Sequence, residues 1–159
     1  MGLYLWEEKH MKSIVIYFSE SGNTKKAAQF IAQETHSDID ELKPIKPYPD
    51  NYDQLVERSG DEIDNNIHPE IDKNLNFSDY NVIYLGYPTW YHRTPMIIDS
   101  FFDTYDLSSK TIIPFTTTYS SEFDESKPFI EKIASTKNVT LSPGFRANSN
   151  TEIKKYLAK

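Results

Sequence analysis

Short apolar runs alternate with helix-like segments along this chain, and that alternation constrains the fold more than any other feature. The runs Ser13–Phe18, Val82–Tyr87 and Thr111–Thr117 are almost continuously apolar, as is typical of strands covered on both faces. Asn23–Thr35 follows the first run with apolar residues at helical spacing. Strand and helix alternate about five times, which predicts an α/β fold with helices on both faces of a parallel sheet.

Weaker signals complete the pattern. Pro114 lies inside the run Thr111–Thr117, and a proline without an N–H predicts an edge strand there. Thr94 and Pro95 predict a helix start with Thr94 as the N-cap. Two further strands are expected, a charged edge strand over Asp38–Lys43 and a last strand over Thr140–Arg146. Further helices are expected over Asn51–Asn65, from Pro95 through Tyr105, and over Ser126–Ser135. A last helix should follow a capping box of Ser149 and Glu152.

The length of 159 residues fits one compact domain. Residues 1–10 carry acidic charge and no long apolar core, so we expect neither a signal peptide nor part of the domain there. Met11 directly precedes the first strand, and we therefore expect an N-terminal extension over 1–10 and one domain over 11–159. These features favour a cytoplasmic protein without a membrane span.

The composition excludes several classes of function. The chain has no cysteine, which removes thiol catalysis, Cys-ligated zinc and iron–sulfur clusters. Its four histidines are scattered, so no metal site is expected. The net charge of −7 argues against binding to nucleic acid or to an anionic membrane surface. It leaves room for a basic protein partner.

Three loops follow the strong strands, and in a parallel sheet such loops gather at one edge and bind ligands there. The first, Ser19–Thr24, runs into a helix and combines small residues, hydroxyls and a helix N-terminus. This composition suits a phosphate cradle, and an ordinary helix cap at Asn23 is the alternative. The loop matches neither the Walker pattern nor G-x-G-x-x-G.

The second and third loops are aromatic and polar. Pro88–Pro95 contains Trp90 and Tyr91, which would either bracket a flat heterocycle or anchor the loop on the core. Thr116–Ser121 offers hydroxyls and one ring, and a plain surface loop is the alternative. Together the three loops predict a ligand with a phosphate at one end and a planar ring at the other.

The chain resembles the flavodoxin family. The resemblance rests on IVIYFSESGNTKKAAQFIA, which is similar to the family's strand, phosphate loop and first helix, and on YLGYPTWYHRTP, which is similar to the G-x-P-x-W loop of a bacterial flavodoxin-like branch. KTIIPFTT and the segment from Lys43 to Ile71 add to it, so it covers the chain from about Met11 onward. It implies a three-layer, doubly wound sheet of five parallel strands in the order 2-1-3-4-5, with TIIPFTT inside the sheet.

The resemblance also implies non-covalent FMN and electron transfer with a redox partner protein or a small-molecule donor or acceptor. It implies cofactor contacts at Ser19, Glu20, Ser21, Gly22, Asn23 and Thr24, at Pro88, Thr89, Trp90, Tyr91 and His92, and at Thr116, Thr117, Thr118 and Tyr119. The chain departs from its relatives at His92, where glycine is common and a positive φ costs a histidine energy. It is also poor in glycine over Thr118–Ser121.

Three alternatives remain open at this point. An NAD(P)H-dependent quinone reductase on the same scaffold is the first, although nothing in the sequence marks a nicotinamide site. A hydrolase using Ser19 or Ser21 with His92 and Asp99 is the second, and it lacks the G-x-S-x-G elbow. The third is a binding domain that has lost flavin. No catalytic residue is predicted for the electron carrier.

Overall fold

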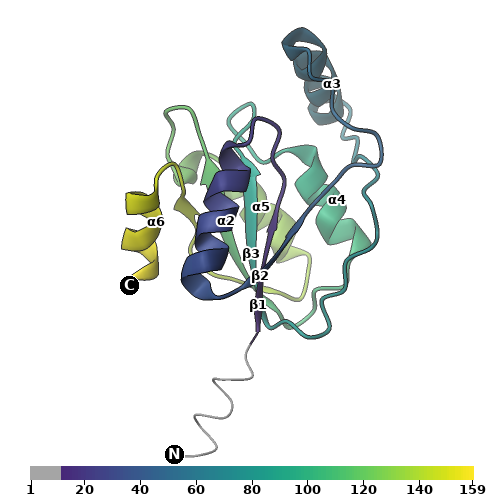
Figure 1. Cartoon of the computed structure of the whole chain (residues 1–159). Helices are drawn as coiled ribbons and strands as arrows, with labels where there is room; N and C mark the ends of the chain where they lie inside the picture. Colours follow the sequence, from purple (N-terminus) through teal and green to yellow (C-terminus); the bar gives the residue numbers. More distant parts are fainter. Residues whose placement is uncertain (1–11) are drawn as a thin grey trace, which may run out of the picture.

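The computed structural model describes residues 12–159. The expected extension over 1–10 and the domain start at Met11 lie outside the described residues. Figure 1 shows a sheet between two layers of helices.

All strand pairs of the main sheet are parallel, and the sheet order is β2-β1-β3-β4-β5, with β6 also paired to β4. This confirms the order 2-1-3-4-5, since β5 and β6 are two halves of the expected last strand. The charged strand β2 lies at an edge, as predicted. The strands are β1 (Ser13–Tyr17), β2 (Asp38–Glu41), β3 (Val82–Pro88), β4 (Thr111–Thr117), β5 (Thr140–Leu141) and β6 (Phe145–Arg146).

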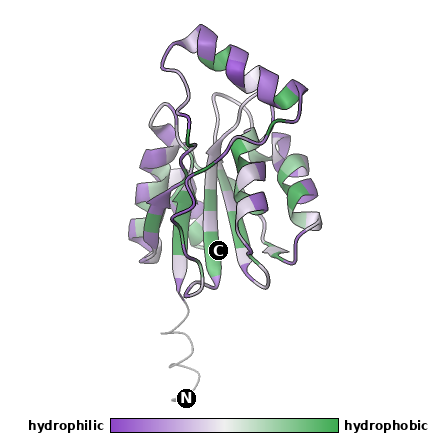
Figure 2. Cartoon of the chain, turned by 90° about the vertical axis from the view of Figure 1, so that its right-hand side faces the viewer, coloured by the Kyte–Doolittle hydropathy of each residue, from purple (hydrophilic) through white to green (hydrophobic). Residues whose placement is uncertain are grey.

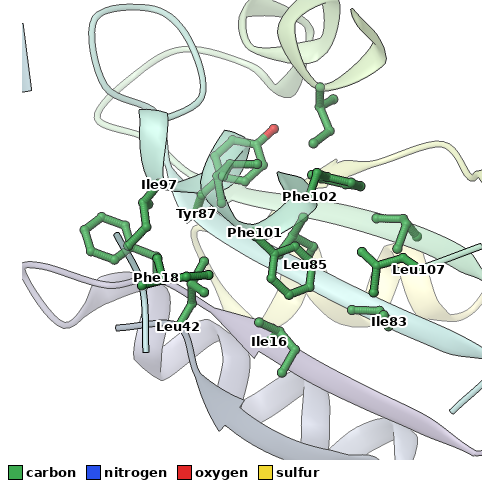
Figure 3. Packing of buried hydrophobic residues seen from close by; sticks show 14 of the residues in the cluster. Ile16, Phe18, Leu42, Ile83, Leu85, Tyr87, Ile97, Phe101, Phe102 and Leu107 are labelled. Atoms are coloured by element: carbon green, nitrogen blue, oxygen red, sulfur yellow. The ribbon is translucent and has the colours of Figure 1, made fainter. Parts of the chain in front are cut away.

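Helices cover both faces of the sheet because successive side chains of the strands point to opposite sides. Helix α2 (Asn23–Thr35) packs with α6 (Asn150–Leu157) on the face of Val15 and Tyr17. Helices α4 (Met96–Thr104) and α5 (Lys127–Ser135) pack on the other face. Figure 3 shows side chains from β1, β3 and α4 meeting in that second core.

Helix α3 (Tyr52–Asp64) stands apart from both layers. Figures 1 and 2 place it across the end of the sheet where the strands of the core have their carboxyl ends. Only Ser59 and Glu62 of this helix are buried. Its position above that end makes α3 a neighbour of the loops in which sequence analysis places the functional site.

The prediction that Pro114 marks an edge strand was wrong. Carbonyl oxygens of Ile112 and Thr116, on either side of Pro114, accept hydrogen bonds from Ser142 and Ala147 at 2.9 and 2.7 Å. Because alternate residues of a strand face the same neighbour, the missing N–H of Pro114 faces this side too. The partner strand is interrupted there between β5 and β6, so no ladder hydrogen bond is lost.

The prediction that Thr94 caps α4 was also wrong. Pro95 is the N-cap, the helix begins at Met96, and the hydroxyl of Thr94 is buried without a hydrogen-bond partner among the described residues. The capping box of α6 forms in part. The Ser149 hydroxyl accepts from the backbone N–H of Glu152 at 3.1 Å, while the carboxylate of Glu152 accepts from the N–H of Asn148 at 2.9 Å instead of from Ser149.

Candidate functional site

Hydrogen bonds join the three loops at the carboxyl ends of β1, β3 and β4. The hydroxyl groups of Thr24 and Thr117 lie 2.7 Å apart, which connects the first loop to the third. The hydroxyl groups of Thr89 and Thr116 also lie 2.7 Å apart, and the N–H of Thr89 donates to the carbonyl of Thr117 at 2.9 Å. Segments about 30 to 90 residues apart in the sequence therefore form one site, as expected for this edge of a parallel sheet.

The first loop has the backbone donors expected of the predicted cradle, and it is not a plain helix cap at Asn23. Gly22 is the N-cap of α2, with a left-handed φ of 96° and no side chain to accept a hydrogen bond. The Ser19 hydroxyl accepts from the N–H groups of Gly22 and Lys25, each at 3.2 Å. Within residues 12–159, the N–H groups of Ser21, Asn23 and Thr24 donate to no protein acceptor. Such N–H groups at a helix start bind anions.

Thr24 is 1% exposed, and its hydroxyl is engaged with Thr117. The resemblance assigns this residue to the phosphate, and the structure adds a second role. Its backbone N–H stays available at the helix start while its side chain fixes α2 to β4. The cradle is thus built on a buried connection between two elements of the core.

Trp90 lies in an aromatic cluster at the mouth of the site. Its ring meets Phe18 and Tyr48 edge to face, with centroids 5.3 and 5.4 Å apart. Phe18 and Tyr48 also contact one another at 5.4 Å. Sequence reasoning missed Phe18 and Tyr48 as members of the site. The position of Phe18 directly before the cradle was the available signal for one of them, whereas nothing local identifies Tyr48.

Tyr91 and His92 form the tip of a two-residue turn, closed by hydrogen bonds of 3.0 and 2.9 Å between Trp90 and Arg93. Their φ values are 51° and 61°, both left-handed. Non-glycine residues pay about 1–2 kcal/mol each for this region. The expected backbone cost at His92 is therefore present and extends to Tyr91. The Tyr91 hydroxyl donates to the carbonyl of Val56 on α3 at 2.7 Å.

The third loop combines buried and exposed groups. Thr116 is fully buried, and its hydroxyl donates to the carbonyl of Tyr87 at 2.8 Å. The N–H of Thr118 donates to the side chain of Asn148 at 2.9 Å, which makes Asn148 a third residue that sequence reasoning missed. Tyr119 is fully exposed. The second loop offers a partly apolar wall beside the third loop, because its residues Pro88, Thr89 and Trp90 are half-buried.

The cradle contains no cation, since residues 19–24 include no Lys or Arg. Burial raises the pKa of Glu20, the acidic group of Asp50 adds to this, and Arg58 opposes it. Arg58 reaches this region from α3, with its guanidinium 4.0 Å from the centroid of the Tyr48 ring and an ion pair to Glu62 at 3.3 Å. Helix α3 therefore brings the positive charge of Arg58 near Glu20, although residues 19–24 contain no cation themselves.

The hydrolase alternative does not assemble in the described residues. Nδ1 of His92 contacts the carboxylate of Glu125, and the Ser19 hydroxyl accepts from the backbone of its own loop. Asp99 lies on α4, where its charged neighbours are His68, Arg93 and Asp103. Across residues 12–159 we find no group of three or more His, Cys, Asp or Glu residues arranged to hold a metal ion.

No helix of the described region is both long enough and apolar enough to span a membrane.

Solved structures with the same architecture are flavoproteins by description. One from Bacteroides uniformis is 27% identical, with a TM-score of 0.82. The match covers 94% of this chain and 99% of that chain. One from Bacteroides eggerthii is 28% identical, with a TM-score of 0.82 and coverage of 92% and 96%. A flavoprotein of Lactobacillus acidophilus in complex with FMN is 22% identical, with a TM-score of 0.79 and coverage of 92% and 99%.

A search of curated proteins gives no match. The flavodoxin family model, in contrast, matches residues 12–159, which is every residue that the structure describes. The strand order, the cradle before α2 and the extent of this match lead to one conclusion: this chain belongs to the flavodoxin family.

Proposed function

We propose that this chain binds FMN non-covalently and transfers electrons. The observation that carries the proposal is the cradle at Ser19–Thr24, where a left-handed Gly22 and free N–H groups present donors to an anion. Membership of the flavodoxin family and an FMN complex of a structural neighbour support it. FMN carries a phosphate and a planar ring, which match the cradle and the aromatic loop.

The residues fit the two ends of this cofactor. The N–H groups of Ser21, Asn23 and Thr24 would hold the phosphate by charge-assisted hydrogen bonds, each contributing about 1.5–3 kcal/mol. Trp90, packed against Phe18 and Tyr48, would form a rigid wall for the ring. The third loop, anchored through Thr118 to Asn148, would meet the polar edge of the ring.

Bound FMN would supply reversible one- and two-electron chemistry, and the chain would set its environment. Residues 19–24 would hold the phosphate with no cation of their own, and the whole protein carries a net charge of −7. The protein therefore disfavours added negative charge on the ring. We include in the proposal a cytoplasmic location and a redox partner protein or small-molecule donor or acceptor.

A comparison of FMN with riboflavin tests the cradle. The flavin-free chain is titrated with each ligand while flavin fluorescence is recorded. FMN should bind at least tenfold more tightly, because riboflavin lacks the phosphate, and a wall at Trp90 should quench the bound flavin. Equal affinities would show that Ser19–Thr24 is only a helix start.

A second experiment separates the carrier from the quinone reductase. The FMN-loaded protein is mixed with NADPH and a quinone without any added reductase. If the protein is only an electron carrier, the NADPH concentration stays unchanged until a separate reductase is added. If the protein is itself a quinone reductase, it consumes NADPH at once. Rapid NADPH consumption would favour the quinone reductase over electron transfer between partners.

A further inference from the structure

The Tyr91–His92 turn is held at both of its residues by contacts with other parts of the chain. The turn itself places two non-glycine residues at φ of 51° and 61°. Left-handed residues of this kind persist where surrounding contacts determine them. The structure shows one such contact for each residue, and the two contacts come from different segments of the chain.

Tyr91 is held by α3. Its hydroxyl donates to the carbonyl of Val56 at 2.7 Å. Gly60 lies beneath it, and a Cβ at that position would come within 3.3 Å of the Tyr91 hydroxyl oxygen. The helix therefore leaves room for the ring of Tyr91 at this point.

His92 is held by the short 3-10 helix η1 (Phe123–Glu125), which follows the third loop. Nδ1 of His92 contacts Oε1 of Glu125. An ionised carboxylate only accepts hydrogen bonds, so this contact fits the His92 tautomer with its hydrogen on Nδ1. The side chain of His92 is 85% exposed and that of Glu125 is 28% exposed, so the better-anchored partner of the pair is Glu125.

The segment that carries Glu125 is fixed to the core. Phe123 is buried, and Ser126, the residue after Glu125, is fully buried with its hydroxyl 2.9 Å from the hydroxyl of Tyr87. Tyr87 belongs to β3, the strand that leads into the aromatic loop. The contact between Glu125 and His92 thus connects a segment anchored in the buried core to the tip of that loop.

We propose that Glu125 is a positioning residue of the flavin site. Through His92 it keeps the Tyr91–His92 turn in its left-handed conformation before the cofactor arrives. A site preorganised in this way binds its ligand more tightly, because none of the binding free energy is lost in ordering the turn. The affinity part of this inference rests on the proposed binding of FMN.

A double-mutant cycle tests the proposal. Glu125→Ala should weaken FMN binding about two- to fivefold, the range expected for one partly exposed side-chain contact. In a His92→Gly background the same change should leave the dissociation constant unaltered, since glycine adopts positive φ without strain and no longer needs the contact. Asp124→Ala is the control, because Asp124 is exposed in the same short helix and its loss removes the same charge.

The full-length chain without flavin gives an independent readout. The N–H of Arg93 donates to the carbonyl of Trp90 at 2.9 Å and closes the turn, so its hydrogen exchange reports the turn conformation. Exchange at Arg93 should accelerate in Glu125→Ala, stay slow in Asp124→Ala, and be largely restored in Glu125→Gln, which keeps an acceptor oxygen.

Two results would overturn the proposal. One is an equal loss of FMN affinity on Glu125→Ala with and without His92→Gly. The other is unchanged exchange at Arg93 in Glu125→Ala. If the chain failed to bind FMN at all, the proposed function would fall, whereas the exchange measurement would still decide whether Glu125 holds the turn.

Discussion

The buried hydroxyl pair of Thr24 and Thr117 fixes the phosphate cradle to the middle of the sheet. The two oxygens lie 2.7 Å apart, and the residues are 1% and 8% exposed. We consider valine at each position, singly and together, since valine keeps the branched shape of threonine and removes only the hydroxyl.

The expected cost follows from burial. Replacing one threonine leaves the other hydroxyl buried without its partner, which costs about 1–3 kcal/mol of unfolding free energy. Replacing both removes the two polar groups together and should be nearly neutral. The pair should therefore show a coupling energy of at least about 2 kcal/mol, while each single variant lowers the melting temperature by about 2–10 °C.

Urea unfolding of the four proteins, followed by circular dichroism, measures this coupling. Thr151→Val serves as a control for the loss of a hydroxyl, because Thr151 is exposed on α6. FMN and riboflavin titrations of the same proteins extend the test to the site. Each single variant should weaken FMN more than riboflavin if, as proposed, the phosphate end of the ligand binds at the start of α2.

The reasoning would be refuted if the double variant lost as much unfolding free energy as the two single variants together. That result would mean that the two hydroxyl groups do not depend on one another, and that Thr24 and Thr117 contribute through packing alone.

Three further outcomes follow from the structure. Gly86→Ala should destabilise the protein by about 1–3 kcal/mol in thermal unfolding, because the new Cβ would lie 2.2 Å from the ring of Phe115; a neutral result would contradict that packing. Burial raises the pKa of Asp99 above its ordinary 3.8, so the folded state binds the proton more tightly and this group's contribution to stability falls as pH rises through and beyond that value. In Asp99→Asn, the unfolding free energy measured with urea at several pH values should fall less as the pH rises. An unchanged pH profile of the unfolding free energy would show that Asp99 does not cause the fall. The net charge of −7 should lower the potential for full reduction of bound FMN by roughly 20 mV for each acidic group about 10 Å away, which a redox titration measures against free FMN.

Local patterns in the sequence determined the elements of this protein. The apolar runs of β1, β3 and β4 and the helical spacing of α2 predict strands and helices within a residue or two of their observed bounds. Periodicity of 2 or 3.6 is a property of neighbouring residues, so a single sequence displays it. The resemblance to a family supplied the strand order, and with it the edge at which three loops meet.

Tertiary structure decided what local patterns do not contain. Pro114 is tolerated inside the sheet because a partner strand about 30 residues away is interrupted opposite it. The candidate site depends on similar encounters: Thr24 meets Thr117, Trp90 meets Tyr48, and α3 lies over the end of the sheet.

The contact of His92 with Glu125 belongs to the same class. Sequence analysis named His92 for the backbone cost of its position, whereas the group that holds it comes from another loop. Each of these contacts joins residues that are distant in sequence and close only after the strands pair and the helices pack. Local propensity therefore specified the elements, and packing between the elements specified which side chains face one another at the site.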